Sequence, residues 1–139
     1  MFDSCTSLTS ININIAKFDT NENKIFSYMF NNCPKLEHLD IKNLLTSKAT
    51  DMSYMFSGCN SLTELNLNSF DTHSVTKMNS MFASCTGIHN LDLSSFDTRN
   101  CKTFDKMFEK VDNMTVKVNK DISSNMVEQI KDFVEITYE

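Results

Sequence analysis

A unit of about 26 residues recurs along this chain and constrains the fold more than any other feature of the sequence. Successive copies of a Met-Phe pair lie 28, 26, 26 and 26 residues apart. A cysteine follows the first four of these methionines, and Val111 replaces it in the fifth copy. One unit of this length cannot bury its own apolar side, so the copies are expected to stack around a shared core. The pairs begin at Met1, Met29, Met55, Met81 and Met107.

The first half of each unit has the spacing of a strand. In the segment 62–67 (LTELNL), Leu65 and Leu67 lie on one face and polar residues lie on the other, which predicts a short strand with one buried face. Equivalent strands of stacked units should run parallel, about 4.8 Å apart. The chain has only two Gly and one Pro, so its corners must be built from Asp, Asn, Ser and Thr.

The second half of each unit has the spacing of a helix. Its apolar residues fall at i, i+3, i+4 and i+7, which predicts about two helical turns. Thr50 and Thr76 stand where the hydroxyl of an N-cap residue would accept a helical N–H. In the clearest copy the apolar positions are Met78, Met81, Phe82 and Cys85.

The repeat ends near residue 120, which predicts a repeat array over 1–120 and a cap over 121–139. The final segment places four apolar residues on one helical face and ends in an alternating stretch, so we expect a closing strand-helix-strand cap. Met1 and Phe2 fall in the middle of a unit, which favours further repeats upstream in the natural chain. The apolar residues of the predicted helix are Ile122, Met126, Ile130 and Phe133.

Composition argues against several classes of function. The net charge is −5 and the 13 Lys and Arg are scattered, which disfavours binding to nucleic acid. No apolar run approaches the roughly 20 residues of a membrane span, and no secretory signal begins the chain, so this segment is expected to be soluble without membrane insertion. His38, His73 and His89 occupy different repeat positions, so no catalytic set recurs and we expect no enzyme.

Residues 67–98 (LNSFDTHSVTKMNSMFASCTGIHNLDLSSFDT) resemble the BspA-like leucine-rich repeats of bacterial surface proteins and lipoproteins. The shared pattern is a leucine strand, Phe-Asp-Thr, and then Val-Thr-x-Met-x-x-Met-Phe-x-x-Cys, and the resemblance covers about residues 1–120. It implies an α/β fold, a right-handed leucine-rich-repeat solenoid with parallel strands on one side and short helices on the other. It also implies a surface-displayed or extracellular module that binds host or matrix proteins. Leu45 in place of the Asp, and Val111 in place of the Cys, depart from the pattern.

Two columns of repeated residues suggest metal chemistry, but each has a simpler interpretation. The cysteines occur singly in each unit, without the close pairs that structural zinc prefers, so we expect reduced thiols that fill the core. Cys101 lies outside this column, and we expect it at a small core position; it would be the reactive thiol only if it were exposed. Asp19, Asp71 and Asp97, each followed by Thr, offer hard oxygen ligands for calcium, but side-chain bonds that hold a corner explain them equally well. We therefore predict no metal and no cofactor.

The candidate binding residues lie on the predicted surface. Outward positions of successive strands form polar, mildly acidic columns, which either contact a partner or are merely solvated. Tyr28 and Tyr54 should stack between units as exposed neighbours and could anchor a partner. The resemblance to BspA-like repeats favours a protein-binding module over a purely structural spacer. The strand-face candidates are His38, Asp40, Glu64, Asn66, Asn90 and Asp92.

Overall fold

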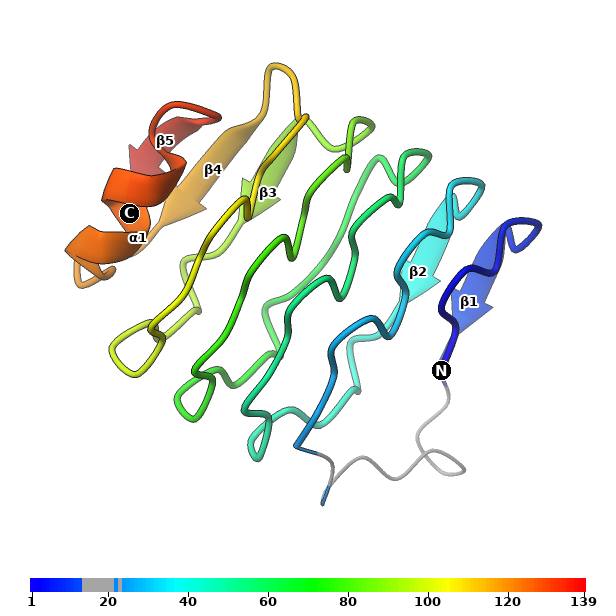
Figure 1. The fold of residues 1–139 in the computed structure, drawn as a ribbon, viewed down its shortest axis with the longest axis horizontal. Coiled ribbons are helices and arrows are strands. Elements are labelled where there is room, and N and C mark those ends of the chain that lie inside the picture. The colour runs from blue at the N-terminus through cyan, green and yellow to red at the C-terminus, as the bar shows by residue number, and fades with distance from the viewer. Residues whose placement is uncertain (14–21, 23) are drawn as a thin grey trace.

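The chain winds into successive coils that lie side by side, with short parallel strands along one side (Figure 1). The computed structural model describes residues 1–13, 22 and 24–139. One sheet pairs β1 with β2, and a second sheet has the order β3-β4-β5, with every pair parallel. The elements are β1 (Ser10–Asn12), β2 (His38–Asp40), β3 (Asn90–Asp92), β4 (Thr115–Val118), α1 (Ser124–Ile130) and β5 (Glu135–Tyr138).

The strand predicted over 62–67 does not form a ladder with either neighbour. Its side chains alternate as predicted, with Leu65 and Leu67 buried and Glu64 exposed. However, no backbone hydrogen bond joins Thr63–Leu67 to β2 or β3 within the described chain, so the strand layer is split at this coil. Paired strands need a separation of about 4.8 Å. Stacked phenyl rings in the core have centroids 5.4–5.8 Å apart, and the two longest distances belong to Phe56, in the coil of the unpaired segment.

The helices predicted in the second half of each unit are wrong. Between Ser80 and Cys85 the backbone N–H groups alternate between two acceptors. Those of Ser80, Phe82 and Ser84 donate to carbonyl oxygens of the next coil, and those between them donate to the carbonyl three residues earlier. A two-turn helix would leave most of its terminal N–H and C=O groups without partners, whereas this arrangement bonds every N–H from 80 to 85. We call these segments, residues 26–33, 52–59, 78–85 and 104–111, the turn side.

Left-handed backbone conformations make this alternation possible. In each Met-Phe pair from Met29 on, the residue before the Met has positive φ. So does the residue before each repeated Cys and before Val111, which replaces it, and the chain therefore turns so that Met, Phe and Cys face inward. Helical spacing of apolar residues therefore reports burial here but not helical geometry. The first of these positions is occupied by Tyr28, Tyr54, Ser80 and Lys106, and the second by Ser4, Asn32, Gly58, Ser84 and Lys110.

The capping role predicted for two threonines is also wrong. The hydroxyl of Thr76 donates to the carbonyl oxygen of Thr50 at 3.1 Å, and that of Thr50 donates to the carbonyl of Lys24 at the same distance. Isolated parallel bridges accompany these bonds, linking Ile25 to Asp51 and then to residues 77 and 103. The threonines thus tie one coil to the preceding coil.

A continuous core runs through the stack, and α1 lies at its C-terminal end (Figure 1). Met126 and Ile130 of α1 are buried and Ile122 packs against the core, as the predicted helical face requires. Phe133 is an exception, because α1 ends at Ile130 and leaves this ring 43% exposed. Ser123 precedes α1 without a side-chain capping bond, and its N–H donates to the Thr98 hydroxyl instead. The boundary between 1–120 and 121–139 stays a prediction.

Candidate functional site

A shallow groove opens on the strand side where the strand layer is split. Its volume is about 510 Å³, and it is lined by β2, the unpaired segment 64–68, and two residues of β3. Because the unpaired segment lacks ladder bonds, its polar side chains and those of its neighbours surround an open depression rather than a closed sheet. We call it the central groove. Six of the eight candidate residues from the sequence line it: His38, Asp40, Glu64, Asn66, Asn90 and Asp92.

Half of these six side chains hold corners of the coils. Asp40, Asn66 and Asp92 each accept, through Oδ1, the backbone N–H two residues later, at 3.4, 3.0 and 2.9 Å. This bond turns the chain out of the strand, as Asx turns do elsewhere. We call these three residues the turn-holding column, because their identity is explained by the local backbone alone.

The side chains of the other three groove candidates do not hold a corner of a coil. Each member of this second group is exposed, and none of their side chains forms a hydrogen bond or ion pair with another described residue. They lie two positions before the turn-holding column, so successive coils place them next to one another across the groove. We call them the free column: His38, Glu64 and Asn90.

Cations within the chain already neutralise the outer carboxylates of the groove. Asp40 lies 3.3 Å from Lys42 Nζ, and Asp92 lies 3.3 Å from Lys117 Nζ. Hydrogen bonds from Ser94, with a smaller effect of Lys117, lower the pKa of Asp92 below its usual value. Glu64 has no such cation among the described residues. The uncompensated negative charge of the groove is therefore at its centre.

The sequence did not identify the apolar part of the groove. Leu39 and Leu65 alternate with the polar residues, a spacing that predicts burial in the core, but both also line the groove. Leu65 is 8% exposed and Leu39 is half-buried. Asn68 lines the groove as well and belongs to an outward column in the sequence. An inward leucine has the same sequence pattern whether its strand is hydrogen-bonded to its neighbours or unpaired, so one sequence cannot predict which leucines line a groove.

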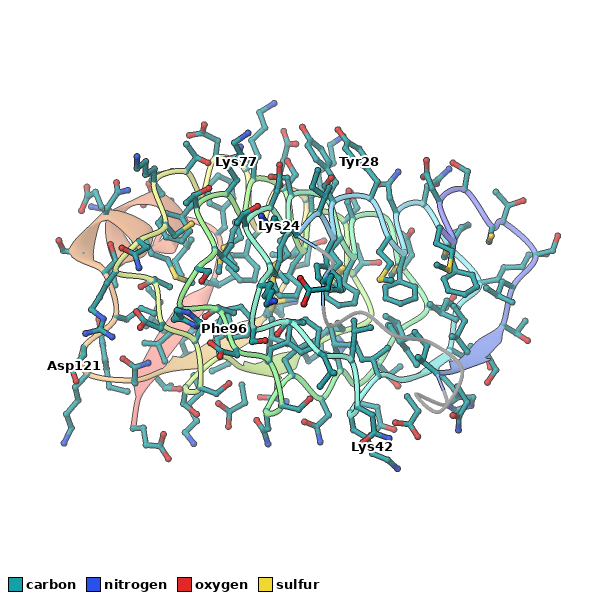
Figure 2. All side chains as sticks on the ribbon, turned by 90° about the horizontal axis from the view of Figure 1, so that it is seen from below. Lys24, Tyr28, Lys42, Lys77, Phe96 and Asp121 are labelled. Carbon is teal, nitrogen blue, oxygen red and sulfur yellow. The ribbon has the colours of Figure 1, made fainter. Side chains whose placement is uncertain are left out.

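The two candidate tyrosines lie on the turn side, away from the groove. Their rings stack with centroids 4.7 Å apart and planes 6° apart, which confirms the predicted stacking. Tyr28 is 45% exposed, whereas Tyr54 is partly buried. Figure 2 shows Tyr28 and Lys77 at one edge of the molecule and Lys42, beside the groove, at the opposite edge. The eight candidates thus form two separate surfaces.

The repeated cysteines are structural. The thiols of Cys33, Cys59 and Cys85 are buried, and each donates to the carbonyl oxygen of a Phe in the preceding coil at 3.0–3.1 Å. Burial raises the pKa of Cys59 to about 12 and also raises that of Cys85. Cys101 is buried too, as a small core position requires, and burial raises its pKa to about 11. The exposure that would make it the reactive thiol is absent.

The corner aspartates bind side chains of their own coil. Asp97 lies 2.6 Å from Arg99 Nη2, and hydrogen bonds from Arg99 lower the pKa of Asp97 to about 2. Asp71 accepts from the N–H and ring of His73 in the same way. A side chain hydrogen-bonded to each carboxylate competes with calcium for the carboxylate oxygens and disfavours calcium here. Asp19 and Thr20 of this predicted column lie outside the described residues.

One local chain of hydrogen bonds has the residue types of a catalytic triad. Ser74 Oγ is 2.9 Å from His73 Nε2, and His73 Nδ1 is 2.6 Å from Asp71 Oδ1. These three residues lie within one surface corner, and none of them lines the central groove. The next corner makes the equivalent bonds with Arg99 instead of His73, so the geometry is that of a corner.

No group of three or more His, Cys, Asp or Glu side chains among residues 1–13, 22 and 24–139 is placed to hold a metal ion. Over the same residues, no helix has the length and apolar character to cross a membrane.

Stacked equivalent coils with an exposed polar groove define a repeat protein. A family model described as DUF285, a Mycoplasma protein of unknown function, matches residues 35–139, and the chain belongs to this family. No curated protein and no solved structure matches the chain.

Proposed function

We propose that this chain is a non-catalytic protein-binding module of a surface-displayed repeat protein, with the central groove as its binding face. The observation that carries the proposal is the free column. His38, Glu64 and Asn90 are exposed, line one groove, and have side chains that bond to no other described residue. Extended faces of repeat proteins are common binding surfaces. Family membership leaves the function open, so the proposal rests on this site and on the resemblance to BspA-like leucine-rich repeats.

The same resemblance underlies our proposal for fold and location. We propose a right-handed leucine-rich-repeat solenoid in which the turn side takes the place of the usual helices. Parallel strand pairs on one side and the repeat of 26 residues support it. A position at the cell surface or outside the cell follows from the resemblance alone.

The experiment is a screen of the purified chain against an array of host-surface and matrix proteins. Any binder is then tested with a triple variant, His38→Ala, Glu64→Gln and Asn90→Ala, and with a control, Tyr28→Ala and Tyr54→Ala. Because the side chains of the free column make no bonds within the described chain, the triple variant should keep its melting temperature. We expect it to lose binding while the tyrosine variant keeps it. Absence of any binder, or equal binding by the triple variant, would reject the proposal.

A structural spacer is the alternative function. It is favoured by the backbone bonds that join successive coils on the turn side, since these make the stack stiff. A spacer predicts that the triple variant supports full function of the natural protein. A binding module predicts that function is lost.

A further inference from the structure

We infer that the central groove takes an arginine or lysine side chain from an extended basic segment of the partner protein. This inference rests on the proposed function and specifies the chemistry of its partner. It starts from Glu64, which lies in the middle of the groove between His38 and Asn90.

Charge is the first argument. Each of the outer carboxylates, Asp40 and Asp92, has a lysine ammonium at 3.3 Å, but Glu64 has no cation among the described residues. A cation brought by a partner would meet one uncompensated carboxylate flanked by two compensated ones. Electrostatic complementarity of this kind selects partners and register more than it adds affinity.

The apolar floor is the second argument. Leu39 and Leu65 line the groove below the polar side chains. Lysine and arginine have long apolar stems that pack on such surfaces while the charged head stays at a polar rim. Glutamate or phosphate ligands would meet like charge, and a purely apolar side chain would leave Glu64 without a partner. The groove therefore fits an amphipathic cationic side chain better than these alternatives.

Hydrogen bonding favours arginine over lysine. A guanidinium can bind a carboxylate through two parallel N–H groups, and its remaining donors can reach neighbouring oxygens. The side-chain amide oxygen of Asn90 is one such acceptor in the groove. The volume of about 510 Å³ lies within the range of sites that hold small ligands, so an arginine with its flanking backbone can be accommodated.

The test is an NMR titration of the ¹⁵N-labelled chain with the blocked peptide Gly-Ser-Arg-Ser-Gly. A matched peptide carries citrulline, which has nearly the same shape without the charge. We expect amide shifts at Leu39, Glu64 and Asn90 with the arginine peptide, weakening as salt is added, and about tenfold weaker binding of the citrulline peptide.

Variants complete the test. Glu64→Gln should weaken binding of the arginine peptide about tenfold. The control Glu109→Gln removes the same charge on the turn side, where Glu109 pairs with Lys106, and should leave binding unchanged. Equal binding of both peptides, no shift in the groove, or an unaffected Glu64→Gln variant would overturn the inference. If a partner found by array screening still binds through the groove in that case, the proposed function stands and only the cationic occupant is rejected.

Discussion

At the scale of single residues, buried threonines join adjacent corners of the stack. The Thr72 hydroxyl donates to the carbonyl oxygen of Asp97 at 3.0 Å and accepts the Asp97 N–H at 2.8 Å. Thr46 makes the same two bonds with Asp71. Each of these threonines is nearly inaccessible to solvent. One side chain therefore satisfies two backbone groups of the next coil, which explains why the corners need Thr rather than an apolar residue of equal shape.

Replacing Thr72 by Val should be more destabilising than replacing it by Ser. Val leaves the N–H and the carbonyl of Asp97 without partners, and unsatisfied buried groups cost about 1–3 kcal/mol. Ser keeps both bonds and loses only a methyl group, worth about 0.8 kcal/mol. Urea unfolding of the two variants measures the difference in the free energy of unfolding. Equal stabilities would show that the hydroxyl bonds do not matter.

The buried thiols should make the protein less stable at alkaline pH. Burial raises the pKa of Cys59 from 9.0 to about 12, so the folded state favours the neutral thiol. The stabilisation is complete below pH 9 and is lost as pH rises from 9 toward 12, because the unfolded chain then ionises more readily. Urea unfolding at pH 7 to 10 in reductant measures this decline.

The control for that decline is Cys59→Ala. The other titrating groups are the same in the parent chain and in this variant. The difference between the two slopes of unfolding free energy against pH therefore isolates the contribution of the Cys59 thiol. We expect a shallower loss of stability above pH 9 in the variant. Identical slopes would mean that Cys59 is not protected in the folded state.

At the scale of elements, the turn side depends on left-handed residues at fixed positions. Gly58 has φ of 76°, and the equivalent Ser84 has φ of 59°. Residues other than Gly are strained there by about 1–2 kcal/mol. We expect Ser84→Gly to raise the free energy of unfolding by up to about 1 kcal/mol. Gly58→Ala should lower it, because the added Cβ would lie 3.2 Å from the Asn32 Cα atom.

Thermal unfolding of both variants measures these opposite changes. If Ser84→Gly is destabilising, the left-handed conformation is not what limits this position. Because Gly58 and Ser84 lie one repeat apart, each variant serves as the matched control for the other.

On the turn side, the spacing of apolar residues predicts their burial but not their backbone conformation. Burial is predicted well, since Met78, Met81, Phe82 and Cys85 are all buried where the spacing places them. The backbone conformation of these residues is not predicted, because a two-turn helix and the backbone of the turn side place the same residues inward. Only the bonds between coils decide between them, and these bonds involve residues about 25 positions apart.

For the candidate site too, the sequence predicts some features and only the structure shows the others. The outward columns follow from strand alternation, so the polar residues of the groove are predicted from the sequence. The groove itself arises because the segment 63–67 is unpaired, which depends on the spacing of whole coils. The distinction between the free column and the turn-holding column likewise requires the corner bonds of Asp40, Asn66 and Asp92.

At the scale of the whole molecule, the two sides of the stack have different bonding. On the turn side, alternate N–H groups bind the next coil, and phenyl rings stack beneath them (Figure 2). On the strand side, the ladder is interrupted and a groove opens. The rigid side can hold the coils in register while the other side leaves side chains free to contact a partner.

Each coil contacts only its neighbours in the stack, so the loss of stability caused by a mutation should stay near the mutated coil. Met126 of α1 is fully buried at the C-terminal end of the stack, so Met126→Ala should cost about 2–5 kcal/mol. Phe133→Ala is the control from the same end, because that ring is 43% exposed and should cost about 0.5 kcal/mol or less.

Hydrogen exchange of amides that bond between coils tests whether the damage stays local. The Phe82 N–H binds the Met107 carbonyl near the C-terminal end, and the Phe30 N–H binds the Met55 carbonyl two coils earlier. In Met126→Ala we expect faster exchange at Phe82 and Ser84 and an unchanged rate at Phe30, since stability in such stacks is a sum over neighbouring units. Equal acceleration at Phe30 and Phe82 would instead mean that all the coils unfold as one cooperative unit.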